Sequence, residues 1–146
     1  MILEGNQRGG ARDLALHLMS PENEHAEIHE IRGFVSDDLL GAFRESYAMS
    51  LGTKCDQHLY SLSLNPPLNE KATIQDFEQA VAQVEKKLGL ENQPRAIVFH
   101  EKHGRRHAHA VWSRIDTQHR RAVQLSYTKR KLQEISRDLY IQHGWT

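Results

Sequence analysis

The 146-residue sequence contains a single cysteine, Cys55, so no disulfide can form within the chain. It also lacks long apolar runs: the first residues turn polar after Leu3, and no later segment approaches the ~20 apolar residues of a membrane span. There is no excess of charge, because 19 Lys and Arg balance 19 Asp and Glu. These absences exclude a disulfide scaffold, a secretory signal and a membrane helix. We therefore expect a cytoplasmic protein that folds as one domain over residues 1–146.

Charge is unevenly distributed along the chain. Residues 100–146 contain ten Lys and Arg but only four acidic residues, so this third carries +6 and the first 99 residues carry −6. Such a split is compatible with a polyanion-binding face, although a run of charges is also typical of a solvated surface. If the chain binds DNA, the candidate phosphate contacts are Arg105, Arg106, Arg120, Arg121, Lys129, Arg130 and Lys131.

Four segments have the apolar spacing of amphipathic helices. Two of them begin with capping signals, Ser36-Asp37-Asp38 in one and Thr73 with Asp76 in the other. In the first of these two, Tyr47 falls on the face of Leu40 and Phe43, so we expect Tyr47 in the core. The predicted helices are Ala11–Met19, with Pro21 behind it as a stop signal, a helix from Ser36 towards Gly52, one from Thr73 to Gly89, and Lys131–His143.

Between these helices lie short apolar or alternating runs that are typical of strands. They are Met1–Glu4, Ala26–Arg32, Gln57–Asn65, Arg95–Phe99 and His107–Ile115. Strands interleaved with helices, and including at least one hairpin, predict an α+β fold in which an antiparallel central sheet is flanked by helices. The chain ends just after the last predicted helix, which is compatible with a domain taken from a longer protein.

Three histidines lie on the last predicted hairpin in the pattern His100-x6-His107-x-His109. Side chains alternate along a strand, so His107 and His109 share a face, and a four-residue turn over Lys102–Arg105 would place His100 opposite His107. Directly opposed Cβ atoms lie roughly 4.5–5.5 Å apart, so the three imidazoles would converge and could bind one divalent metal. Spacing alone leaves an alternative, because His-x-His also arises by chance in histidines without a ligand.

The histidine pattern resembles the third motif of the relaxase/mobilisation nucleases, which belong to the HUH endonucleases. That motif consists of an apolar strand, a histidine, six residues, and His-x-His on a second apolar strand. The likeness extends to the segment Gly9–Arg12, to Ser61–Pro67 and to the closing helix Leu132–Gly144. It implies an HUH relaxase-like fold with the metal histidines on the two central strands. Two positions differ from the family pattern: Lys102 stands where an acid is common, and Ser113 where an asparagine is common.

Relaxases usually attack the scissile phosphodiester with a tyrosine in an N-terminal helix, but this chain has no tyrosine before Tyr47. By resemblance, the position of the nucleophile falls on His17. A neutral imidazole is a nucleophile without prior deprotonation, so this assignment is chemically reasonable. The alternative is that His17 is only the polar edge of its helix. Tyr127, beside Lys129–Lys131, is the rival nucleophile or a platform for base stacking.

The resulting prediction is a DNA relaxase that nicks and rejoins one strand at the transfer origin of a plasmid or integrative element through a covalent protein–DNA intermediate. Its expected partners are single-stranded DNA and accessory relaxosome proteins, with no membrane. The resemblance implies one divalent ion, Mg or Mn, whereas imidazole ligands by themselves favour softer metals such as Zn or Ni, which could replace it in a crystal. Two other functions remain open: a metal-dependent hydrolase acting on a small substrate, and a non-catalytic module that binds single-stranded DNA.

Overall fold

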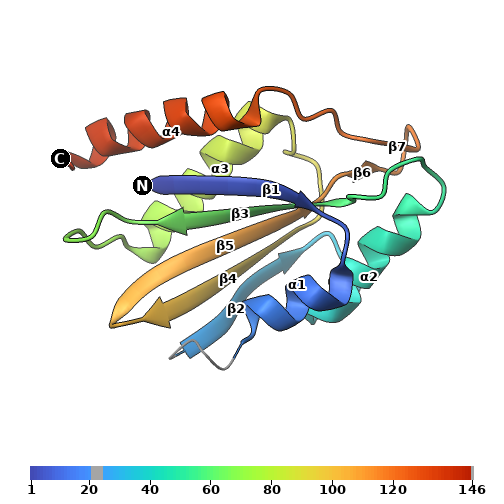
Figure 1. The fold of residues 1–146 in the computed structure, drawn as a ribbon, viewed down its shortest axis with the longest axis horizontal. Coiled ribbons are helices and arrows are strands. Elements are labelled where there is room, and N and C mark those ends of the chain that lie inside the picture. The colour runs from blue at the N-terminus through green and yellow to red at the C-terminus, as the bar shows by residue number, and fades with distance from the viewer. Residues whose placement is uncertain (21–24, 146) are drawn as a thin grey trace.

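The computed structural model describes residues 1–20 and 25–145, so the predicted stop signal at Pro21 lies outside the described residues. Its centre is a five-stranded antiparallel sheet in the order β1-β3-β5-β4-β2 (Figure 1). The strands are β1 (Ile2–Arg8), β2 (His25–Arg32), β3 (Leu59–Asn65), β4 (Arg95–Lys102) and β5 (Arg105–Ser113). The predicted α+β fold is confirmed, although β1 continues well beyond the strand predicted at Met1–Glu4.

The described chain forms helices α1 (Ala11–Leu18), α2 (Leu39–Ser50), α3 (Ile74–Leu88) and α4 (Thr128–His143). The predicted capping signals are present: the Asp38 side chain accepts a hydrogen bond from the Gly41 amide at 2.6 Å, and Thr73 and Asp76 form a capping box. α4 begins one turn before the predicted start at Lys131. Within the described residues, none of the helices is long and apolar enough to cross a membrane.

A small hairpin of β6 (Ile115–Asp116) and β7 (Arg121–Ala122) follows the central sheet. The sequence did not predict it as a separate element, because two-residue strands are too short to show a period of alternation. The strand predicted over His107–Ile115 is therefore divided at Arg114. The hairpin places Arg120 and Arg121 beside the loop that follows α2.

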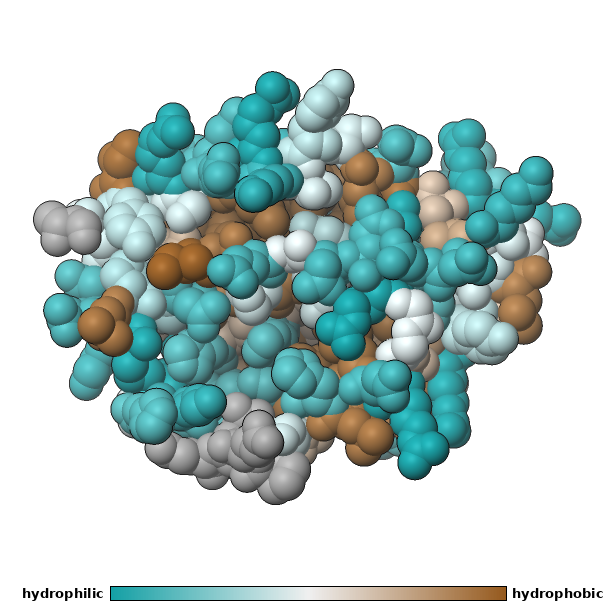
Figure 2. All heavy atoms as spheres, in the orientation of Figure 1, coloured by the Kyte–Doolittle hydropathy of each residue, from teal (hydrophilic) through white to brown (hydrophobic). Residues whose placement is uncertain are grey.

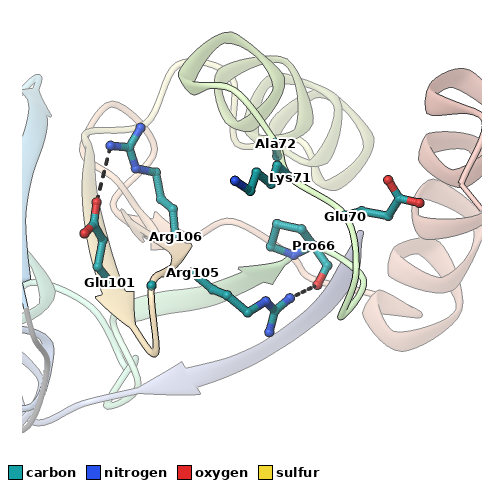
Figure 3. A pocket seen from close by; sticks show the side chains of 8 residues that line it. Pro66, Glu70, Lys71, Ala72, Glu101, Arg105 and Arg106 are labelled. Carbon is teal, nitrogen blue, oxygen red and sulfur yellow. Dashed lines mark hydrogen bonds and ion pairs between the residues drawn. The ribbon is translucent and has the colours of Figure 1, made fainter.

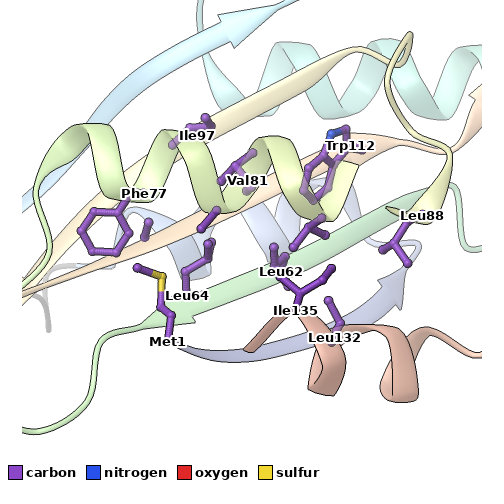
Figure 4. Close-up of a cluster of buried hydrophobic side chains, with 14 of the residues drawn as sticks. Met1, Leu62, Leu64, Phe77, Val81, Leu88, Ile97, Trp112, Leu132 and Ile135 are labelled. Atoms are coloured by element: carbon purple, nitrogen blue, oxygen red, sulfur yellow. The ribbon is translucent and has the colours of Figure 1, made fainter. Parts of the chain in front are cut away.

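One face of the sheet is covered by α3 and α4, which lie on its far side and along its upper edge in Figure 1. Side chains from β3, β4 and β5 meet Phe77, Val81 and Leu88 of α3 and Leu132 and Ile135 of α4 (Figure 4). Burying one such side chain stabilises the fold by about 1.5–3 kcal/mol. Because strand residues alternate, the apolar residues facing this core leave the histidines of β4 and β5 on the other face.

The second face of the sheet is covered in part by α1 and α2. Leu14 and Leu18 of α1 and Phe43 of α2 pack there against Val98 and Val111. Contrary to the prediction, Tyr47 is outside this core and is 52% exposed. The reason is that α2 turns its Leu39, Ala42, Phe43 and Ser46 side inward, which leaves Tyr47 at the margin of the buried stripe.

A buried carboxylate joins the sheet to α3. Glu85 Oε1 accepts hydrogen bonds from Arg95 Nη1 at 3.0 Å, from Arg32 Nη2 at 2.5 Å and from Trp112 Nε1 at 2.9 Å. The Glu85 and Arg95 side chains are 9% and 11% exposed, so these bonds are shielded from water. The network fixes α3 against the central strands that carry the histidines.

Candidate metal and DNA-cleavage site

The hairpin of β4 and β5 positions the predicted histidines. Its strands are joined by His103 and Gly104, whose φ angles of 54° and 71° are those of a type I′ turn. Glycine adopts such a backbone without strain. The register pairs His100 with His107, as predicted from the spacing, and pairs Val98 with His109. His107 therefore lies opposite His100, and His109 lies two residues further along β5 on the same face of the sheet.

The histidine cluster consists of His100, which is buried, and of His107 and His109, which are half-buried. The ring centroids of His100 and His109 are 4.6 Å apart, and His100 is 5% exposed. His100 Nε2 is hydrogen-bonded to the carbonyl oxygen of Leu18 in α1. His107 Nδ1 is buried and has no hydrogen-bond partner among the described residues. A buried polar atom without a partner in the protein is normally bound by a ligand or a water molecule.

The environment keeps the cluster neutral at physiological pH. Burial lowers the pKa of His109 to about 3, and positive charge on His100, His17 and His107 acts in the same direction. Burial also lowers the pKa of His100 and of His107, and for His107 the charge of Arg105 adds to the effect. Each neutral imidazole retains one nitrogen lone pair, which is the form that binds a metal.

His17 lies in the last turn of α1, beside the cluster. Its side chain is exposed, and positive charge on His17 would lower the pKa of both His100 and His109. The adjacent residue, Leu18, provides the carbonyl that contacts His100. The fold therefore brings the end of α1, which carries His17, to His100, although more than 80 residues separate the two in the sequence.

A sequence model of the relaxase family, described as MobA/VirD2-like, nuclease domain, matches residues 17–145. The chain belongs to this family. No curated protein matched the chain. Relaxases of this family are metal-dependent enzymes that nick DNA, and they bind single-stranded DNA at transfer origins. The matched region begins at His17 and includes all three histidines of the cluster.

Tyr127, the rival nucleophile of this relaxase domain, lies elsewhere. It precedes α4, which packs on the α3 side of the sheet, whereas the histidine cluster is on the α1 side. Tyr127 is 72% exposed, and the guanidinium of Arg130 lies 5.0 Å from the centre of its ring. This placement leaves Tyr127 available for stacking but separates it from the predicted metal ligands.

The basic residues predicted to contact DNA occupy three places rather than one face. Arg105 and Arg106 line a pocket of about 190 Å³ together with Lys71, Glu70 and Glu101 (Figure 3). In this pocket Arg105 donates hydrogen bonds to the carbonyls of Pro66 and Pro67, and Arg106 is paired with Glu101 at 3.6 Å. Lys129, Arg130 and Lys131 are on the first turn of α4.

The third place is the pocket lined by Arg120 and Arg121, which we call the basic pocket. Its volume is about 780 Å³, and Lys54 and Arg114 also line it. None of its described lining residues is acidic. Sequence reasoning missed Lys54, because this isolated lysine precedes β3 and reaches the arginines only through the fold.

The histidine cluster fits a metal chemically, but its side chains would have to adjust. Among the described residues, no three His, Cys, Asp or Glu side chains are placed so that they could hold an ion together. A carbonyl oxygen can only accept a hydrogen bond, so the contact with Leu18 requires the proton of His100 to be on Nε2. The other ring nitrogen, Nδ1, then has a free lone pair. A backbone carbonyl that accepts a hydrogen bond from the other ring nitrogen is a usual partner of a metal-binding histidine. Together with the orphaned His107 Nδ1, this supports a site for a divalent ion.

Proposed function

We propose that this relaxase domain nicks and rejoins one strand of DNA at a plasmid or integrative-element transfer origin, with His17 as the nucleophile. The observation that carries the proposal is the position of His17, an exposed imidazole that directly precedes Leu18, whose carbonyl contacts the buried His100 of the histidine cluster. A nucleophile next to a site for a cation is the arrangement that phosphodiester transfer requires. Tyr127, by contrast, directly precedes α4, a helix that packs with α3 rather than with α1.

In the proposed reaction, a neutral nitrogen of His17 attacks the scissile phosphorus and forms a P–N bond. The P–O3′ bond breaks, the 3′ oxygen takes up a proton, and the other ring nitrogen of His17 releases one. The 5′ phosphoryl end of the DNA then remains on the protein, and attack by a 3′ hydroxyl reverses the steps. His100, His107 and His109 would hold the divalent ion, Mg or Mn, which when bound polarises a non-bridging phosphate oxygen.

The surface around the cluster suits a DNA strand. Ser63 of β3 pairs with His109, and Glu4 of β1 pairs with Ser63, so a polar surface continues from the histidines to the edge of the sheet. Hydrophilic residues cover most of the face of the molecule on the α1 side (Figure 2). The basic pocket lies beyond the end of β5, roughly 15 Å from His109 at the rise of a strand. We propose that it holds phosphates that flank the cleavage position.

The test is incubation with single-stranded oligonucleotides from transfer-origin DNA plus Mn²⁺, followed by a denaturing gel. A covalent adduct identifies a transesterase, whereas cleavage without adduct, or binding alone, indicates one of the other functions. If His17 is the nucleophile, the adduct is a phosphoramidate and breaks in mild acid, whereas a tyrosine ester survives. The adduct should be lost in His17→Ala and retained in the matched variant Tyr127→Phe. An acid-stable adduct on a tyrosine would show that the assignment of His17 is wrong.

A further inference from the structure

A chain of buried polar side chains crosses the molecule between β5 and the start of α1. It consists of Ser113 at the end of β5, Ser46 in α2 and His58 just before β3, and all three residues are 0% exposed. Ser113 Oγ and Ser46 Oγ are 2.8 Å apart, and Ser46 Oγ is 2.8 Å from His58 Nδ1. His58 Nε2 lies 3.1 Å from the carbonyl oxygen of Gly9. None of these residues belongs to the histidine cluster.

The direction of the hydrogen bonds in this chain is determined at its Gly9 end. A carbonyl oxygen only accepts, so His58 Nε2 carries the proton. Burial lowers the pKa of His58, which keeps the ring neutral and makes Nδ1 an acceptor for the Ser46 hydroxyl. Ser46 then accepts from the Ser113 hydroxyl, and Ser113 Oγ accepts from the Ile115 amide at 3.3 Å. Ser46 Oγ also lies 3.3 Å from the carbonyl oxygen of His58, but its shorter contact is with Nδ1 at 2.8 Å.

Gly9 and Gly10 are the entry to α1. Gly10 is the N-cap of α1 and provides no side-chain cap, while its carbonyl accepts from the Leu14 amide at 3.1 Å. A Cβ on Gly9 would lie 2.8 Å from the backbone oxygen of Asp56, so this segment is pressed against the residues that lead into β3. The bond from His58 is therefore the side-chain hydrogen bond that ties the backbone at the start of α1 to the sheet.

We propose that His58, oriented by Ser46 and Ser113, is a positioning residue that fixes the start of α1 and so holds His17 against the histidine cluster. This inference rests on the proposed role of His17. From Gly9 to His17 is roughly 12 Å along a helix, so a tilt of about 5° at the start moves His17 by about 1 Å. A displacement of that size can slow a reaction by about 10²-fold. The proposal also gives a role to Ser113, the position where the family commonly has asparagine.

The test compares two amide variants of His58 in the full chain. In His58→Gln the amide nitrogen comes near the place of Nε2 and retains the donor to Gly9, whereas in His58→Asn the shorter amide lies near Nδ1 and loses that donor. We expect His58→Asn to form the covalent adduct about 10²-fold more slowly in single-turnover experiments, and His58→Gln to stay within about tenfold of the unchanged protein. DNA affinity should be unchanged in both variants.

Hydrogen exchange of the metal-free protein provides a readout that does not depend on catalysis. The Leu14 amide and its neighbours in α1 should exchange faster in His58→Asn than in His58→Gln, while amides of α3 keep their protection. Equal adduct rates and equal exchange in the two variants would overturn the proposal, as would an equal loss of protection in α1 and α3. If the unchanged protein forms no adduct, the proposed function fails, and the exchange data then decide whether His58 positions α1.

Discussion

Replacing His109 should make the stability of the metal-free domain less sensitive to pH. Burial and the neighbouring histidines lower the pKa of His109 to about 3 in the folded protein, against 6.5 for an ordinary histidine. The unfolded chain therefore binds a proton at this residue between about pH 6.5 and 3, and the folded chain does not. As a consequence, the stability associated with neutral His109 is fully present above pH 6.5 and is lost progressively as the pH falls below it.

The size of this effect follows from the two pKa values. Between pH 7.5 and 5.5, the unfolded His109 changes from mostly neutral to mostly protonated, while the folded residue stays neutral. The proton-binding polynomial of the unfolded residue increases tenfold between pH 7.5 and 5.5, and a factor of ten corresponds to about 1.4 kcal/mol. His109 alone should therefore reduce the free energy of unfolding by about 1.4 kcal/mol when the pH falls from 7.5 to 5.5. His100 and His107 contribute in the same direction, because their pKa values are also lowered.

The assay is urea unfolding of the domain with a chelator present, at pH 7.5 and pH 5.5, for the unchanged protein and for His109→Gln. Comparing the two pH values within each protein cancels any loss of stability that does not depend on pH. The difference should be about 1.4 kcal/mol smaller in His109→Gln. The matched control is His119→Gln, which removes an exposed histidine from the turn between β6 and β7. If His109→Gln retains the full pH difference, His109 is not buried in its neutral form and the reasoning about the cluster is refuted.

Three further predictions concern the metal, the DNA and the fold. His107→Ala should weaken Mn²⁺ binding at least tenfold in calorimetry, whereas His17→Ala should not, and equal affinities would contradict the ligand assignment. Arg121→Ala, in the basic pocket, should reduce the slope of log affinity against log salt concentration for single-stranded DNA by about 0.7. Lys86→Ala on α3 should leave that slope unchanged. The same slope in both variants would show that the basic pocket does not contact DNA phosphates. Glu85→Gln should cost about 1.5–3 kcal/mol of unfolding free energy, because it removes the charge from an acceptor shared by Arg32 and Arg95 while Arg95 keeps its pair with Glu30. Glu134→Gln, which breaks an exposed pair with Lys87, should barely change the urea midpoint, and similar midpoints in the two variants would show that the Glu85 network is not shielded.

The fold and the histidine hairpin could be predicted from sequence because they depend on local signals. Alternation along β4 and β5 and the length of the turn are sufficient to pair His100 with His107. Capping residues likewise mark the start of α2 and α3, because a capping side chain and its backbone partner are only two or three positions apart. Such signals are contained within a few residues and do not require knowledge of the remaining structure.

Other features depend on contacts between distant segments and gave no sequence signal. Lys54 reaches Arg120 and Arg121 only because the loop after α2 lies against the β6–β7 hairpin. His58 has no motif around it, and its role follows from being buried between α2, β5 and the segment before α1. Tyr47 was misplaced for a related reason: helical spacing identifies a face, but the sheet decides which edge of that face is covered.

The contact between Leu18 and His100 links the two halves of the proposed chemistry. Leu18 follows His17 directly, and its carbonyl holds the proton on His100 Nε2. Any movement of α1 that displaces the proposed nucleophile therefore also frees the His100 ring to change its tautomer. Conversely, a divalent ion held by His100 would strengthen the Nε2–H donor to the Leu18 carbonyl and so would hold α1 in place. The geometry thus predicts that metal binding orders the helix that carries His17, so that nucleophile and metal site are assembled together.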